Sequence, residues 1–85
     1  MNCTLVKLKP GQSGIIVEIQ GGKGLESQLN RLGIRSGKRI TKVSSVFSHG
    51  PVTVEVDNFQ VAIGYGKASR IVVEVENGEK NRSGR

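Results

Sequence analysis

Apolar residues recur at the spacing of a helix in one stretch of this chain. Leu25, Leu29 and Leu32 occupy positions i, i+4 and i+7, which lie on one face of a helix. Gly33 follows the last leucine, where helices commonly end on a residue with positive φ, and Ile34 can fold back onto the final turn. The spacing predicts a short helix that ends at Gly33 and packs its leucine face on the rest of the chain.

Elsewhere the apolar residues alternate with polar ones in short runs, a period typical of half-buried strands. Glycine, proline, asparagine and aspartate separate these runs and favour turns. We predict a two-residue hairpin loop at Asp57-Asn58, since both residues tolerate positive φ, and a compact turn with a single helical turn at 64–69. The predicted strands are 4–8, 14–20, 39–47, 52–56, 59–63 and 70–76.

These elements predict a mainly β domain, a small and highly bent antiparallel barrel of five to six strands with one short helix. In the second predicted strand, Ile15, Val17 and Ile19 share a face. In the third, Ile40 and Val43 fall on opposite faces, and a bulge could bring them into one phase.

The composition suits one small domain: 85 residues, 35% of them hydrophobic. No apolar run approaches the roughly 20 residues of a membrane-spanning helix, and no secretory signal is visible. The single cysteine, Cys3, cannot form an internal disulfide, so we expect a cytoplasmic protein. Because no apolar residue follows Glu76, we predict a domain over 1–76 and a disordered polar tail over 77–85.

Candidate catalytic side chains are few. His49 lies in a predicted turn and Cys3 near the N-terminus, so a surface histidine and a terminal thiol are a simpler interpretation than a Cys–His pair. A serine hydrolase would need His49 together with Asp57, the only aspartate, within one hairpin, which is implausible. We therefore expect no enzymatic activity.

Metal and phosphate motifs are incomplete as well. Structural zinc needs four Cys or His ligands at short spacings, which the chain lacks. Glu74, Glu76 and Glu79 could form a carboxylate site, but Glu74 and Glu76 at alternate strand positions are more simply a solvated sheet face. The cluster 22–24 lacks the Ser or Thr of a phosphate loop, and the cluster 64–66 lacks the third glycine of a dinucleotide loop. We expect no cofactor and no metal site.

The charge of the chain is unbalanced, with a net value of +6. Such an excess suits an acidic protein, a nucleic acid or an anionic membrane, and does not choose among them. With nearby apolar residues, a basic run can form a charged rim around an apolar patch, although a plain solvated surface is its more common meaning. The run that no acid interrupts is Arg31, Arg35, Lys38, Arg39 and Lys42.

Three ordered motifs carry a resemblance. The first is Leu5-x-x-Leu8-x-x-Gly11-x-x-Gly14-x-Ile16-x-x-Ile19. The second is Leu25-x-x-x-Leu29-x-x-Leu32-Gly33-Ile34-x-x-Gly37-x-x-Ile40. The third is Gly50-Pro51-Val52-x-Val54, followed by Val61-Ala62-Ile63-x-x-x-x-Ala68-x-x-Ile71-x-Val73. Together they resemble the ferrous iron transport protein A (FeoA) family over residues 5–75, in its free-standing form, because no helix-turn-helix is present.

The resemblance implies an SH3-like barrel with an inserted helical segment. It also implies a cytosolic accessory or regulatory protein of ferrous iron uptake, recruited to the inner face of the cell membrane by FeoB, a permease with a cytosolic GTPase domain. The family is associated with transition metal ion binding, although the Cys and His content here argues against a site.

The surface expected to bind FeoB is the predicted helix and the turn that follows it. Burial in the core is expected more for Leu29 and Leu32 than for Leu25. Leu25 is therefore the expected apolar anchor. The basic side chains would orient the encounter. The expected partner-binding residues are Leu25, Arg31, Leu32, Ile34, Arg35, Lys38 and Arg39.

Two other functions remain open from the residues. A small basic barrel can bind nucleic acid, but such barrels usually stack bases on aromatic residues, and we expect Phe47 and Phe59 to pack in the core. Binding of a proline-rich peptide in the manner of SH3 domains also needs aromatic residues, for which Tyr65 alone is thin support.

Overall fold

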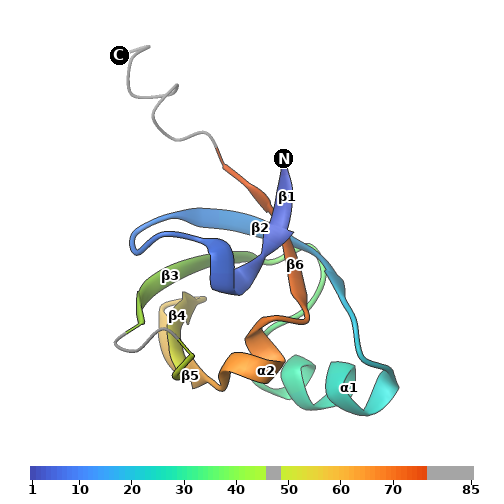
Figure 1. Cartoon of the computed structure of the whole chain (residues 1–85). Helices are drawn as coiled ribbons and strands as arrows, with labels where there is room; N and C mark the ends of the chain where they lie inside the picture. Colours follow the sequence, from blue (N-terminus) through green and yellow to red (C-terminus); the bar gives the residue numbers. More distant parts are fainter. Residues whose placement is uncertain (46–48, 77–85) are drawn as a thin grey trace.

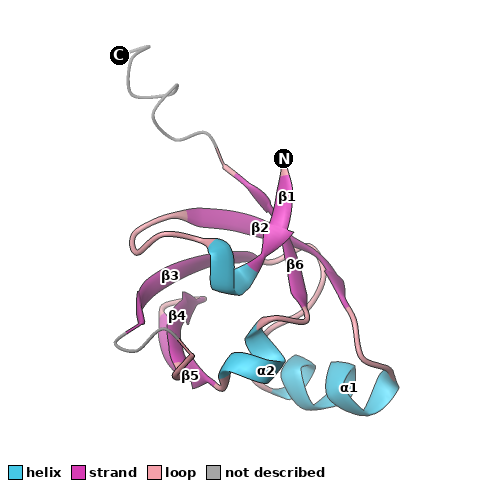
Figure 2. Ribbon diagram, in the orientation of Figure 1, coloured by secondary structure: helices cyan, strands magenta, loops and turns pink. Residues whose placement is uncertain are grey.

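The computed structural model describes residues 1–45 and 49–76. One antiparallel six-stranded sheet bends around the core, with two helices at one end (Figures 1 and 2). The strands follow the order β1-β6-β2-β3-β4-β5. This is the predicted mainly β barrel. Its elements are β1 (Asn2–Thr4), η1 (Leu5–Lys7), β2 (Ser13–Ile19), α1 (Lys23–Arg31), β3 (Arg39–Ser45), β4 (Val52–Val56), β5 (Phe59–Ile63), α2 (Tyr65–Ala68) and β6 (Ile71–Val75).

The core draws side chains from the sheet, from η1 and from both helices. Helix α1 itself contributes only Leu29 as a fully buried side chain, and Ile34 joins the core just after the helix ends. The β4 positions Val52, Val54 and Val56 are all buried, as their alternation predicts. The buried apolar residues are Leu5, Leu8, Ile16, Leu29, Ile34, Ile40, Val52, Val54, Val56, Ile63, Ala68, Ile71 and Val73.

The prediction of a first strand over residues 4–8 is wrong. The chain forms the short strand β1 and then the 3₁₀ turn η1, in which the Leu8 amide donates to the Leu5 carbonyl oxygen at 3.1 Å. Positions i and i+3 of a 3₁₀ turn lie on the same side. Leu5 and Leu8 are both buried as a result, which continuous strand alternation would not permit.

Bulges modify the alternation in β2 and β3. The β2–β6 register shifts between Ile16 and Glu18, so Ile16 faces the core while Val17 is 40% exposed. Strict alternation along this strand is therefore wrong. The β3–β4 register shifts between Lys42 and Ser44, where an irregularity was expected. Ile40 is buried in the core, whereas Val43 is only half-buried and does not belong to the core cluster.

The β4–β5 hairpin forms at the predicted loop. Asp57 and Asn58 have φ values of 53° and 70°, the left-handed pair that a two-residue hairpin requires. Phe59, the next residue, is 71% exposed, so its predicted place in the core is wrong. Phe59 is the first residue of β5, next to the loop, and does not belong to the core cluster. Phe47 lies outside the described residues.

The domain boundary at residue 76 stays a prediction, since residues 77–85 lie outside the described part of the chain. In the described residues, no helix is long and apolar enough to cross a membrane.

Candidate partner-binding surface

The C-terminal end of α1 is fixed by backbone hydrogen bonds. The Gly33 amide donates to the Asn30 carbonyl oxygen and the Ile34 amide to the Leu29 carbonyl oxygen, each at 3.0 Å. Gly33 has φ of 88°. This is the Schellman arrangement, in which the residue after the glycine contacts the last helical turn. Ile34 is fully buried as a consequence, so its predicted contact with a partner is wrong.

Leu32 is the exposed apolar residue at this end. It caps α1 with φ of −89° and ψ of 2°, and 48% of it is exposed. Leu25 instead packs partly buried against the core, and an ideal Cβ built on Gly21 would lie 2.9 Å from its Cδ2 atom. The expected order of the two leucines is therefore reversed, and Leu32 is the available apolar anchor.

The four basic residues of the expected surface fall into two groups. Arg31 and Arg35 are exposed and, within residues 1–45 and 49–76, form no salt bridge or side-chain hydrogen bond. Lys38 and Arg39 are engaged by acids of other elements. Leu32, Arg31 and Arg35 are exposed and follow one another closely at the end of α1, and they are called here the α1-end patch.

The engaged pair of cations lies toward the sheet. The Lys38 Nζ atom is 2.6 Å from an oxygen of Asp57, and the Arg39 Nε atom donates to Glu76 Oε2 at 2.8 Å. This hydrogen bond and the charge of Glu76 raise the pKa of Arg39 above its ordinary value. Exposed pairs of this kind contribute at most about 1 kcal/mol to stability, and they leave Lys38 and Arg39 less available to a partner.

Lys42, the last residue of the basic run, does not belong to a charged rim. It is only 4% exposed, and its Nζ atom donates to the Val6 and Leu8 carbonyl oxygens at 3.0 and 2.7 Å. Its ammonium group therefore holds η1 against β3 instead of facing solvent.

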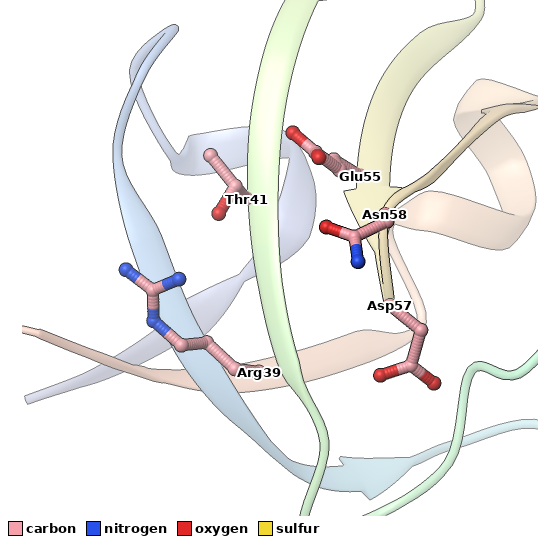
Figure 3. Close-up of a pocket in the computed structure, with 5 residues that line it drawn as sticks. All are labelled: Arg39, Thr41, Glu55, Asp57 and Asn58. Atoms are coloured by element: carbon pink, nitrogen blue, oxygen red, sulfur yellow. The ribbon is translucent and has the colours of Figure 1, made fainter.

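A shallow polar hollow of about 380 Å³ opens beside Arg39 (Figure 3). Two carboxylates and one guanidinium line it, together with an amide and a hydroxyl. Arg39 and Asp57 already have ionic partners, and Glu55 forms no ion pair within the described residues. The hollow therefore offers one carboxylate for a cationic group. Its lining residues are Arg39, Thr41, Glu55, Asp57 and Asn58.

A model of the FeoA domain matches residues 3–75 of the chain, which is most of its length. The chain belongs to the FeoA domain family. It is 32% identical over 72 residues to a protein of Campylobacter jejuni named Fe(2+) transport protein A, covering 85% of this chain and 97% of that protein. Membership in the family associates the chain with ferrous iron transport.

Solved structures agree with the fold of a FeoA domain. A crystal structure of an iron uptake regulatory protein, FeoA, is 33% identical with a TM-score of 0.82, and the match covers 89% of this chain and 99% of that one. The zinc complex of Stenotrophomonas maltophilia FeoA, described as a procaryotic SH3 domain protein, is 24% identical with a TM-score of 0.71, covering 84% and 88%. The SH3-like barrel expected from the resemblance is thus the fold of this FeoA domain.

The candidate catalytic residues of this FeoA domain are placed in separate contacts. Cys3 lies in β1 opposite Val73 of β6, whereas the His49 ring lies 4.7 Å from the Tyr65 ring, centroid to centroid. Asp57 is bound by Lys38. Within residues 1–45 and 49–76, no three His, Cys, Asp or Glu side chains gather where they could hold a metal ion.

The sequence analysis includes Leu32 in the expected surface but favours its burial, and it places Phe59 in the core; both residues are exposed. For Leu32 a signal was present, because Gly33 ends the helix directly after it and the cap residue no longer follows the helical face. For Phe59 the signal was its place beside the two-residue loop, at the end of β5.

Proposed function

We propose that the chain is a cytosolic accessory protein of ferrous iron uptake that binds FeoB through the α1-end patch. Its membership of the FeoA family supports the transport role. The observation that carries the choice of surface is Leu32, 48% exposed between two arginines that have no ionic partner among the described residues.

The patch has the composition of a small protein-binding site. An exposed leucine can enter an apolar pocket of a partner, and binding removes its surface from water. Arg31 and Arg35 are close to it in the sequence and form no ion pair among the described residues, so they can orient an acidic partner surface during the encounter. Lys38 and Arg39 would first have to leave Asp57 and Glu76, and we assign them no direct contact.

The test is a pull-down of the purified protein with full-length FeoB in detergent and, separately, with the isolated cytosolic GTPase domain. We expect Leu32→Asp to weaken binding by roughly 30-fold, the loss of an anchor residue worth about 2 kcal/mol. Replacing both Arg31 and Arg35 with Glu should weaken binding at low salt more than at high salt, because screening already removes their steering at high salt.

Matched controls lie elsewhere on the surface. Val17→Asp places the same charge at another exposed apolar residue, and Lys9→Glu with Lys23→Glu reverses the same number of charges at exposed residues outside the patch. Equal binding by wild type and Leu32→Asp would exclude the α1-end patch. No binding of wild type to either form of FeoB would contradict the proposed function, and salt-sensitive retention on RNA or DNA would then support the nucleic-acid alternative.

A further inference from the structure

Strand β5 is one edge of the sheet, and its free side is well defined. Among the described residues it pairs only with β4, from Val52 opposite Ile63 to Val56 opposite Phe59. The pair next to a two-residue loop exchanges both backbone hydrogen bonds, and every second pair does the same. Gln60 and Ala62 lie between these pairs, so their amides and carbonyls point away from the sheet.

This edge lacks the features that normally prevent strand pairing. Edges are usually protected by charged side chains, proline, bulges or short length. Residues 59–63 contain no charge and no proline, and the β4–β5 register has no shift, unlike β2–β6 and β3–β4. The opposite edge, β1, is only three residues long. The ring of Phe59, 71% exposed, adds apolar surface to β5.

We propose that β5 pairs antiparallel with β5 of a second copy of this chain, on a two-fold axis that passes beside Val61. In this register Gln60 of each copy exchanges hydrogen bonds with Ala62 of the other, so all four outward polar groups of each strand are satisfied. Phe59 lies opposite Ile63 of the other copy, and the two strands extend both sheets into one.

A second copy fits this edge because the edge is symmetric in itself. The outward-pointing residues stand one on each side of Val61, so an antiparallel copy satisfies both without any offset. The ends of β5 also differ in charge. The loop end carries Asp57, whose side chain remains 54% exposed beside Lys38. The other end leads directly into α2 (Figure 1), where Lys67 is exposed. Antiparallel pairing brings Asp57 of each copy toward Lys67 of the other.

The first test is sedimentation velocity over a range of concentrations. Wild type should rise from 9.1 kDa toward twice that mass, and Ala62→Pro should lower the association constant at least tenfold. Proline removes only the outward amide of an edge strand and leaves the β4–β5 ladder intact. Ala62→Ser, which keeps that amide, should associate like wild type.

A second test does not depend on tolerance of proline. Directly opposed residues outside the hydrogen-bonded pairs have Cα atoms about 4.5 Å apart, within the range of a disulfide. With Cys3→Ser as the background, Val61→Cys should therefore cross-link to itself on mild oxidation. Gln60→Cys should cross-link at least tenfold more slowly, since its copy would lie diagonally at about 7–8 Å.

Each result decides the pairing. A concentration-dependent dimer that Ala62→Pro weakens, with selective cross-linking at position 61, supports it. A wild-type protein that stays monomeric at concentrations up to about 1 mM overturns it, because its dissociation constant would then be weaker than about 1 mM. A dimer that forms equally in folded Ala62→Pro, or cross-linking at position 60 as fast as at 61, overturns it too, because the copies would then meet elsewhere.

Discussion

At the scale of single residues, Gly14 is where the sheet tolerates no side chain. A Cβ at this position would lie 2.7 Å from the backbone carbonyl oxygen of Glu74 in β6, and a backbone atom cannot swing aside as a side chain can. We expect Gly14→Ala to lower the free energy of unfolding by about 1–3 kcal/mol, the usual effect of overpacking. Urea denaturation measures this change.

The control for this prediction is Gly24→Ala. Gly24 lies in α1 with open space around the position of a Cβ, so alanine should raise stability by up to about 1 kcal/mol through its better helix propensity. If both substitutions had the same effect, the contact between Gly14 and β6 would not limit the side chain there.

Lys42 illustrates a second residue-scale effect, a buried charge used as a clamp. Its Nζ atom donates to two backbone carbonyl oxygens. Its backbone amide donates to the Gln12 carbonyl oxygen at 3.0 Å, and its carbonyl oxygen accepts from the Gly11 amide at 2.7 Å. Lys42→Met keeps the length of the side chain but removes both donors. We expect a loss of about 1–3 kcal/mol, since buried acceptors are left unpaired.

Thermal and urea unfolding of this variant should be compared with Lys67→Met, which removes an exposed ammonium group and should change stability by less than about 0.5 kcal/mol. Equal stabilities for the two variants would contradict a clamping role for Lys42. Hydrogen exchange of the Leu8 and Gly11 amides should also accelerate in Lys42→Met, because η1 and the following turn lose their attachment to β3.

At the scale of elements, the β4–β5 hairpin depends on two left-handed residues. Asn58 has φ of 70°, which costs a residue with a Cβ about 1–2 kcal/mol unless its side chain compensates. We expect Asn58→Ala to lower stability by about 1 kcal/mol and Asn58→Gly to leave it equal or higher. Equal stability of the Ala and Gly variants, measured by urea denaturation, would contradict the left-handed conformation at this loop.

The same scale shows which elements the sequence could predict and which it could not. The alternating valines predict β4 because one face of that strand lies against the core along its whole length. Gly33 predicts the end of α1 because glycine readily adopts the positive φ found there. The 3₁₀ turn η1 was missed because the weak alternation over residues 4–8 predicts a strand, although the spacing of three between Leu5 and Leu8 suits one side of a 3₁₀ turn. The phase of β2 was missed because a bulge beside Val17 depends on the neighbouring strand β6.

For the candidate site, periodicity was sufficient to find the basic run but not to separate its members. Arg31 and Lys42 look alike in the sequence, and only tertiary contacts expose one and bury the other. Ile34 belongs to the core because the Schellman turn directs it there, which a pattern of basic and apolar residues does not distinguish from a surface patch. Which cations are already paired depends on acids 19 and 37 residues away.

At the scale of the whole molecule, the sheet is complete only when the last strand, β6, pairs with the first two strands. Strand β6 lies between β1 and β2, with Asn2 opposite Glu74 and Ile19 opposite Ile71. A chain that ends at Arg70 would lose this strand and the buried side chains Ile71 and Val73, so we expect it to be unfolded by circular dichroism and by NMR.

A chain that ends at Glu76 keeps the Arg39–Glu76 ion pair and the bond from the Glu76 amide to the Ser13 carbonyl oxygen. Its free energy of unfolding should lie within about 0.5 kcal/mol of that of the full chain, because changes away from buried contacts usually have effects of this size. A clear loss of stability on removing residues 77–85 would refute the predicted boundary at residue 76, because that segment would then contribute to the fold.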